Sequence, residues 1–147
     1  MPEMSARRRF LTIPFVFLLL SGSAFAEPLT ISVGEAKSLV RVVLRHERIN
    51  LSSRYCELEQ LDKYGKSFVA DYYSFGASCD YPNTAATTPF GVYVVSPRTG
   101  DVWEFNRCQF FEFPELRRLQ RNIMHRTHTT EASESQYRER TGCTKTP

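Results

Sequence analysis

The hydrophobic period of this chain changes twice along the sequence, and that change limits the folds that the chain can adopt. Ser32 and Glu35 form the pattern of a capping box, and apolar residues then recur at helical spacing over 33–48. From Arg54 the period becomes two, which is typical of β-strands. A second helical stripe covers 114–127. Helix, strands and helix in this order predict an α+β fold, in which helices cover one face of an antiparallel sheet.

Two hairpins are expected in the alternating region. Asp62-Lys63-Tyr64-Gly65 supplies a turn for the first hairpin, and Ser96-Pro97-Arg98-Thr99-Gly100 supplies one for the second. The predicted strands begin at Arg54 and cover 67–75, 90–95 and 102–105. We therefore predict a four-stranded antiparallel meander between an N-terminal and a C-terminal helix.

A tight first turn would place polar and aromatic side chains together on one face of the sheet. It would set Glu57 opposite Asp71 and Tyr55 opposite Tyr73, because side chains on paired strands meet across the ladder. The opposite, core-facing side would then hold Cys56, Leu58, Phe68 and Ala70. The sequence thus predicts an acidic and aromatic patch on a sheet face that the helices leave open.

The segment 77–89 is long for a hairpin connection, and loops of about 13 residues are uncommon unless they have a function or are disordered. A cysteine near its start would make the loop rigid, which favours binding because less entropy is lost on contact. An ordinary surface loop held for stability is the alternative. Together with the patch, the predicted binding residues are Tyr55, Glu57, Asp71, Tyr73, Asp80, Tyr81 and Asn83.

The first 26 residues have the order of a secretory signal. Arg7, Arg8 and Arg9 precede an apolar run from Phe10 to Leu20, and a small-residue site ends at Ala26. The run is shorter than the roughly 20 residues that span a bilayer, so we predict cleavage and a periplasmic or secreted protein without a membrane span. The arginines also fit a twin-arginine signal, and the export route stays open. Residues 27–147 are predicted to form one domain with a polar tail from about 129, which holds one helical turn near 134–140.

All four cysteines follow the predicted cleavage site, and they are Cys56, Cys79, Cys108 and Cys143. An even number of cysteines in an exported chain indicates disulfides, here two. Three pairings remain open. A metal site is the alternative, but none of these cysteines forms a C-x-x-C pair, so no metal is predicted.

Charge and motifs argue against several classes of function. Without the signal, 16 basic residues face 15 acidic ones, so nothing in the composition favours a nucleic acid as partner. The sequence has no G-x-S-x-G, no H-E-x-x-H and no glycine-rich phosphate loop. The remaining candidates for chemistry are the carboxylates of Glu57, Glu59, Asp71, Asp101 and Glu104 and the pair His125 and His128, which we interpret as ordinary surface residues. We therefore predict no catalytic residue and no cofactor.

Basic residues form a stripe on each predicted helix. The first stripe contains Arg41, Arg45 and Arg48, and the second contains Arg117, Arg121 and His125. A solvated face is the simpler interpretation of both stripes. A docking surface for another protein is the alternative, since such stripes beside acidic strands favour oriented association.

The hairpin Val92-Tyr93-Val94-Val95-Ser96-Pro97-Arg98-Thr99-Gly100-Asp101-Val102-Trp103 resembles the closing hairpin of PepSY-type and cystatin-like exported domains. The resemblance implies a non-enzymatic domain that binds or inhibits another protein. In architecture the chain is also similar to periplasmic immunity proteins. The leading hypothesis is a periplasmic protein-binding or inhibitor module of immunity type, whose partner is an exported enzyme or toxin. A structural or accessory protein of the cell envelope is the alternative and a small hydrolase the third, while the oligomeric state is left open.

Overall fold

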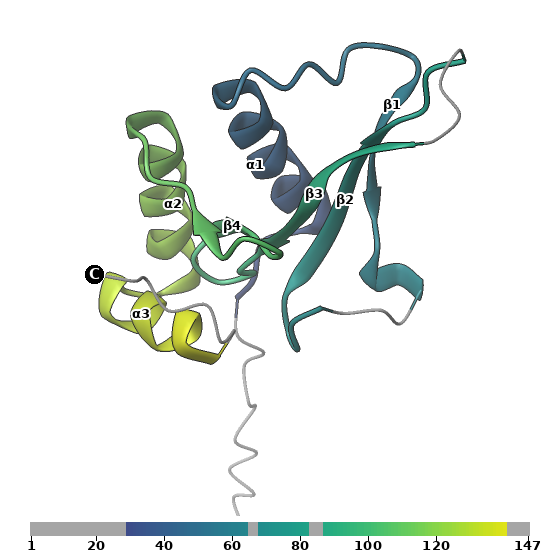
Figure 1. Cartoon of the computed structure of the whole chain (residues 1–147). Coiled ribbons are helices and arrows are strands. Elements are labelled where there is room, and N and C mark those ends of the chain that lie inside the picture. Colours follow the sequence, from purple (N-terminus) through teal and green to yellow (C-terminus); the bar gives the residue numbers. More distant parts are fainter. Residues whose placement is uncertain (1–28, 65–67, 83–86, 141–147) are drawn as a thin grey trace, which may run out of the picture.

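The computed structural model describes residues 29–64, 68–82 and 87–140, and these form an α+β fold as predicted. Helices α1 and α2 lie on one side of an antiparallel sheet (Figure 1). The predicted signal, Asn83 and Cys143 lie outside the described residues.

Helix α1 spans Val33–His46, two residues shorter than predicted. Its start is set by the capping box, in which Ser32 Oγ accepts from Glu35 N at 3.2 Å and Glu35 Oε2 accepts from Ser32 N at 3.1 Å. The apolar face then buries in the core the residues Ala36, Leu39, Val40, Val43 and Leu44. The predicted period of this helix is therefore confirmed.

The sheet has the strand order β1-β2-β3-β4-β5 in the described part of the chain, with every neighbouring pair antiparallel. Its strands are β1 (Cys56–Gln60), β2 (Tyr73–Cys79), β3 (Thr88–Val95), β4 (Val102–Glu104) and β5 (Gln109–Phe110). The meander is confirmed, but it contains a short fifth strand that the sequence pattern missed. Two residues are too few to show an alternating period.

The predicted register of the first hairpin is wrong. Cys56 pairs with Cys79 and Gln60 with Phe75, so Glu57 lies opposite Ser78. Asp71 precedes β2 and is not part of the ladder. The expected tight turn is instead a 3-10 helix, η1 (Asp62–Tyr64), followed by a long connection to β2. A tight turn at this place would have prevented Cys56 and Cys79 from meeting.

The long connection is also displaced from its predicted place. Residues 77–79 belong to β2 and 88–89 to β3, so the connection between the strands covers 80–87 rather than 77–89. A bulge between Ala77 and Ser78 shifts the register there, and Pro89, which lacks an N–H, lies at the bulged end of β3.

Helix α2 spans Pro114–Thr127, as predicted, with Pro114 at its first turn and His128 in the left-handed conformation at its end. Leu116 and Ile123 of this helix join the core that α1 forms with Phe75, Tyr93 and Val95 of the sheet. Helix α3 (Glu131–Arg140) follows, where the sequence predicted a single turn.

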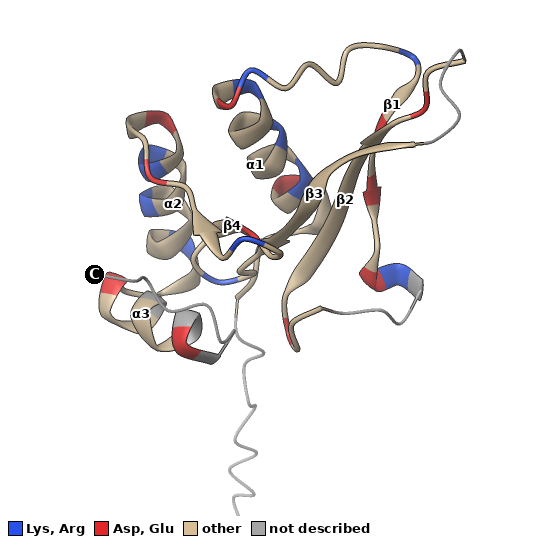
Figure 2. Ribbon diagram, viewed as in Figure 1, with Lys and Arg blue, Asp and Glu red and all other residues tan. Residues whose placement is uncertain are grey.

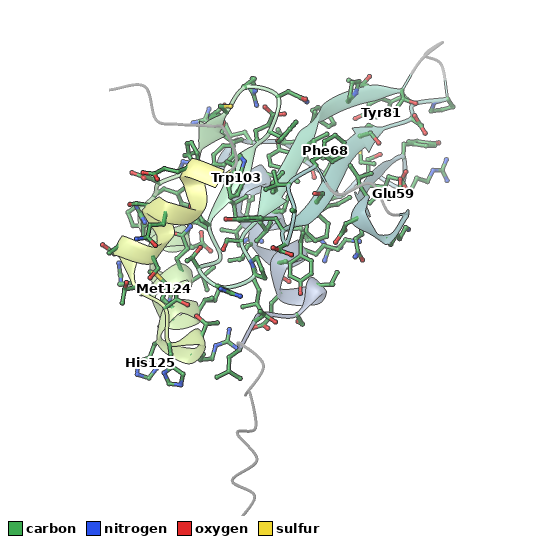
Figure 3. The ribbon with its side chains drawn as sticks, turned by 90° about the horizontal axis from the view of Figure 1, so that it is seen from below. Glu59, Phe68, Tyr81, Trp103, Met124 and His125 are labelled. Atoms are coloured by element: carbon green, nitrogen blue, oxygen red, sulfur yellow. A yellow bond between two sulfur atoms is a disulfide. The ribbon has the colours of Figure 1, made fainter. Side chains whose placement is uncertain are left out.

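The other face of the sheet is partly covered, contrary to the prediction of an open face. Val69 and Tyr72, from the connection between η1 and β2, pack against Val94 and Trp103. Tyr72 meets the Trp103 ring edge-on at 5.2 Å between centroids. Phe68 (labelled in Figure 3), which was predicted to face the core, is 42% exposed. Its ring meets that of Phe105 edge-on at 5.3 Å between centroids, and Phe105 packs against the cluster on this side of the sheet. Ala70 is exposed as well.

Two disulfides were predicted, and among the described residues one joins Cys56 to Cys79. Cys108 is disulfide-bonded as well. Charged residues concentrate on the helices and connections, whereas β2 and β3 carry none (Figure 2). In the described part of the chain, no helix has the length and apolar character that crossing a membrane requires.

Candidate functional site

The disulfide Cys56–Cys79 joins the first residue of β1 to the last residue of β2. It thereby fixes the end of the hairpin from which the segments 53–55 and 80–82 emerge. Backbone hydrogen bonds extend this order, since Asp80 N donates to Tyr55 O at 2.7 Å and Cys56 N donates to Ser53 O at 3.0 Å. The end of the hairpin is therefore held covalently and by hydrogen bonds.

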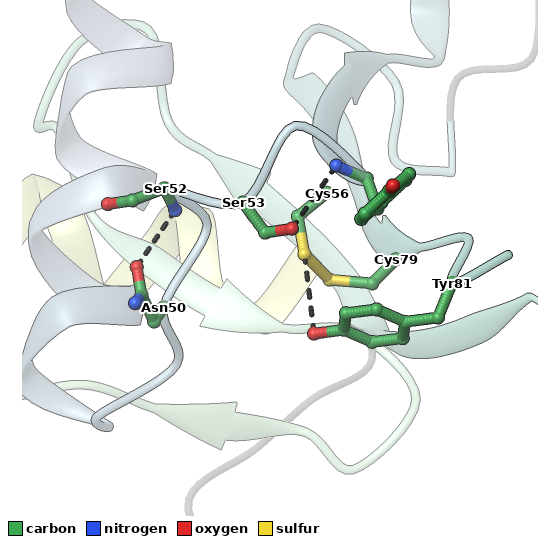
Figure 4. The surroundings of a disulfide bond; sticks show 7 residues. Asn50, Ser52, Ser53, Cys56, Cys79 and Tyr81 are labelled. Carbon is green, nitrogen blue, oxygen red and sulfur yellow. Dashed lines mark hydrogen bonds between the residues drawn. A yellow bond between two sulfur atoms is a disulfide. The ribbon is translucent and has the colours of Figure 1, made fainter. Parts of the chain in front are cut away.

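Two tyrosines lie together at this end. The rings of Tyr55 and Tyr81 are 6.2 Å apart between centroids and inclined at 54°. Tyr81 lies alongside the disulfide, with its hydroxyl 3.7 Å from Cys56 Sγ (Figure 4). The guanidinium of Arg54 lies 4.8 Å from the centroid of the Tyr55 ring, a cation–π contact. We call Arg54, Tyr55, Asp80 and Tyr81 the aromatic tip.

The aromatic tip has the composition of a protein-binding surface. Tyr81 is 42% exposed, and Arg54 and Asp80 are exposed as well. Tyrosine and arginine are enriched among residues that dominate binding energy, because they offer large contact area together with polar groups. A surface held rigid before contact also loses less entropy on binding.

The structure brings together some of the predicted binding residues and separates others. Tyr55, Asp80 and Tyr81 gather at the aromatic tip, and Glu57 is exposed beside it on β1. Cys56 pairs with Cys79, and this pairing places Asp80 and Tyr81 across from Tyr55. The candidate site therefore depends on a strand register that the sequence analysis did not predict.

Asp71 and Tyr73 lie at the opposite end of β2, in a cleft of about 610 Å³ that also holds Asp62 and Arg98. Asp71 adopts a left-handed backbone conformation with φ of 64°. Tyr73 donates from its hydroxyl to Ile31 O at 2.9 Å, and burial together with the charge of Asp62 raises the pKa of Tyr73. These two residues are thus excluded from the aromatic tip.

Two of the candidates for catalysis, Glu104 and Asp101, are buried, so their interpretation as ordinary surface residues is wrong. Glu104 is buried and accepts hydrogen bonds from Arg107 N at 2.8 Å and Val92 N at 3.3 Å. Asp101 is buried and accepts from Gln120 Nε2 at 3.5 Å. His125 and His128 are exposed, and within the described residues no group of three or more His, Cys, Asp or Glu side chains is arranged to hold a metal ion.

The sequence analysis did not identify Arg54 as part of the site. A single arginine before a strand has no distinguishing spacing, and its role depends on the neighbouring ring of Tyr55. The only available signal was an adjacent Arg and Tyr beside a cysteine, in a chain with a predicted export signal.

Comparison with known proteins identifies the family. The model of the family described as "T6SS, Immunity protein Tgi2PP" matches residues 30–135, which include both α1 and α2 and the whole sheet. The chain belongs to this immunity protein family. A solved chain from "Structure of a type VI secretion system effector-immunity complex from Pseudomonas protegens" is similar, with 34% identity, a TM-score of 0.70, and coverage of 78% of this chain and 91% of that chain. No curated protein matches the chain.

Membership of the family confirms the prediction of an immunity-type protein. Neither comparison concerns PepSY-type or cystatin-like domains, so that resemblance stays a hypothesis about one hairpin. The family match covers the aromatic tip, because residues 54–55 and 80–81 lie within it.

Proposed function

We propose that this chain neutralises a type VI secretion effector by binding it. The observation that carries the proposal is the family match over residues 30–135, which spans the described fold from the start of α1 into α3. The similar solved chain comes from an effector-immunity complex, and it shares the fold at a TM-score of 0.70. A protein partner also agrees with the nearly balanced charge of the chain that follows the predicted signal.

The aromatic tip is the proposed contact surface. Tyr55 and Tyr81 present aromatic area that the core does not use, and the Cys56–Cys79 disulfide holds the two segments that carry them. Arg54 and Asp80 add one charge of each sign next to the rings. An aromatic centre with charged neighbours is typical of the residues that dominate protein interfaces.

The proposed place of action is the periplasm, and the proposed mode is stoichiometric binding without catalysis. A disulfide fits an oxidising compartment, and residues 1–26 are proposed to direct export and to be removed. Binding requires no catalytic group, which agrees with the structural roles of Glu104 and Asp101. An accessory envelope protein and a small hydrolase are the alternatives that these observations favour less.

The test uses the oxidised protein from residue 27 onward, together with purified type VI effectors of the bacterium that makes this protein. Calorimetric titration should show one-to-one binding to one of them, with a loss of that effector's toxicity when the complex forms. Replacing both tyrosines, Y55A with Y81A, should weaken binding at least tenfold, because truncation of central aromatic side chains commonly costs about 2 kcal/mol or more.

Phe68 provides a matched control. It is an aromatic residue with the same 42% exposure as Tyr81, but it precedes β2 whereas Tyr81 follows it. The F68A variant should bind within about twofold of the wild-type protein. If the double tyrosine variant binds normally, the contact surface lies elsewhere than at the aromatic tip. If the wild-type protein binds no effector, the proposed function itself is wrong.

A further inference from the structure

A second surface lies near the C-terminal end of α1. Arg41 and Arg45 stand one helical turn apart on the exposed side of α1, and Arg48 follows the end of the helix. These three residues and the segment 49–52 line an open recess of about 510 Å³. We call it the arginine recess.

The arginine recess has an excess of positive charge. Within the described part of the chain, the guanidinium groups of Arg41, Arg45 and Arg48 form no hydrogen bond or ion pair. Arginines elsewhere on the surface do have carboxylate partners, as Arg126 has with Glu35 at 2.6 Å and Arg117 with Glu112 at 3.0 Å. Glu47 is close in sequence but does not line the recess.

A solvated helix end explains part of this arrangement, because the helix dipole favours cations near the C-terminus. It does not explain why the three side chains surround one recess. Arg48 adopts a left-handed backbone conformation with φ of 61°, which is unfavourable for a residue with a side chain. Beyond it, Ile49 N donates to Leu44 O at 2.8 Å and Ser52 N donates to Asn50 Oδ1 at 2.8 Å. The wall of the recess is therefore ordered before any partner arrives.

The recess and the aromatic tip lie along one connection. The chain passes from Arg48 through Asn50 and Ser52 to Arg54 and Tyr55 of the tip. Asn50 and Ser52 lie in the same neighbourhood as the disulfide and Tyr81 (Figure 4), and Figure 1 shows the end of α1 joined to β1 at that side of the molecule. The recess and the tip therefore lie at the two ends of one short connection, within residues 48–55 (Figure 1).

We propose that the arginine recess receives a segment of the effector that carries at least two Asp or Glu side chains. This inference rests on the proposed function and adds the chemistry of the partner. Guanidinium groups match carboxylates in a bidentate geometry, and three of them around one recess select a ligand with several negative charges. Such a field also accelerates association with an acidic partner at low salt.

An anionic membrane surface is a different partner with related chemistry, and the structure favours it less. Peripheral attachment uses exposed apolar side chains beside the basic ones. Among the described residues, the large exposed hydrophobic side chains are Leu29, Phe68 and Tyr81, and none of them lines the recess. A concave basic surface fits a protruding peptide segment better than a flat bilayer.

The first experiment uses a hexaglutamate peptide, so its result does not depend on which effector binds. The arginine Nε–H signals of the oxidised protein are followed by NMR as the peptide is added at low ionic strength. Signals of Arg41, Arg45 and Arg48 should shift together and saturate. Arg118 and Arg121 on α2 are exposed controls whose signals should shift little. Equal shifts at all exposed arginines would show nonspecific binding and would contradict a specific site for acidic ligands at the arginine recess.

The second experiment measures association with the purified effector that the wild-type protein binds. The R41Q/R45Q variant should associate about tenfold more slowly at low salt, and its affinity should depend less steeply on sodium chloride. The R118Q/R121Q variant removes the same charge from α2 and should retain the wild-type rate and salt dependence.

The outcomes separate this proposal from the proposed function. If the wild-type protein binds an effector and R41Q/R45Q binds it with the same rate and salt dependence, the recess proposal is wrong and the function stands. If the wild-type protein binds no effector, the proposed function is wrong, and the peptide titration still decides whether the recess binds an acidic ligand. Retention of the wild-type protein, but not of R41Q/R45Q, on phosphatidylglycerol vesicles, with unchanged effector binding, would assign the recess to an anionic lipid and overturn the proposal.

Discussion

Gly91 lies so close to Glu104 that a Cβ atom at position 91 would be 2.8 Å from Glu104 Oε1. The glycine has a φ of 148°, in a region that side-chain-bearing residues rarely adopt. The space left by the missing side chain is occupied by the carboxylate, which accepts from Val92 N on one side and from Arg107 N on the other. Strand β3 and the β4–β5 turn are thus joined through one buried acid.

Replacing this glycine should destabilise the protein. The G91A variant combines a strained backbone with a clash against Glu104, so we expect the free energy of unfolding to fall by about 1–3 kcal/mol in a urea titration. The G34A variant is the matched control, because a Cβ at Gly34 has only Ser32 Oγ nearby, at 3.8 Å. Helix propensity predicts that G34A is neutral or more stable by up to about 1 kcal/mol. Equal behaviour of the two variants would contradict the close approach.

Glu104 should make stability depend on acid pH. Burial raises the pKa of this carboxyl, but hydrogen bonds from Arg107, Val92 and Asn106 together lower it below the usual value of 4.5. The ionised carboxyl therefore contributes fully to the free energy of unfolding above about pH 4.5. That contribution is lost as the pH falls through the lower pKa of Glu104 in the folded state.

The E104Q variant isolates that contribution. At pH 7 it should be less stable than the wild-type protein by about 1–3 kcal/mol, because a charged acceptor of several buried bonds is lost. Below about pH 4.5 the difference should shrink, since the wild-type carboxyl becomes neutral as well. Urea midpoints between pH 3 and pH 7 measure this, and a difference that stays constant over that range would refute the assignment.

The disulfide of the aromatic tip should contribute a large part of the stability. Cys56 and Cys79 are separated by 23 residues in sequence, and a loop of that size corresponds to about 3 kcal/mol of reduced entropy in the unfolded chain. The C56S/C79S variant should unfold at a correspondingly lower urea concentration. It should also bind the effector more weakly than its remaining folded fraction explains, because Tyr81 loses its fixed position beside the disulfide.

The capping box should be measurable on its own. Replacing Ser32 by alanine removes the acceptor for Glu35 N, and caps of this kind contribute about 1 kcal/mol. Thermal unfolding of S32A should show that loss, and S32D should restore most of it because aspartate accepts the same bond. A loss that S32D does not restore would indicate that Ser32 stabilises the helix in some other way.

The helices could be predicted from sequence because their determinants are local. Ser32 and Glu35 begin α1, Pro114 begins α2, and α1 buries the residues that its period of 3.6 indicated. Helix α2 buries most of its apolar stripe, but Leu119 stays partly exposed and the polar Gln120 is buried. The proposed binding site depended on a non-local feature, namely which residue of β2 faces Cys56. Three cysteine pairings were open, and the pairing with Cys79 is what brings Tyr81 to Tyr55.

The error in the first hairpin has a physical cause. Asp62-Lys63-Tyr64-Gly65 has the composition of a tight turn, but η1 occupies Asp62–Tyr64 and the following connection continues to β2. Burial of Val69 and Tyr72 against Trp103 stabilises this longer connection. No local sequence pattern indicates that contact. Tertiary packing therefore outweighed turn propensity, and it moved Asp71 and Tyr73 away from the site.

Glu35 has a role in both helices. It accepts from the backbone of Ser32 at the start of α1, and it accepts from Arg126 near the end of α2, 91 residues along the chain. When the last turn of α2 frays, the carboxylate that caps α1 loses its cation, so the two ends open more easily together than separately. Amide hydrogen exchange would therefore register the first turn of α1 and the last turn of α2 as one cooperative unit.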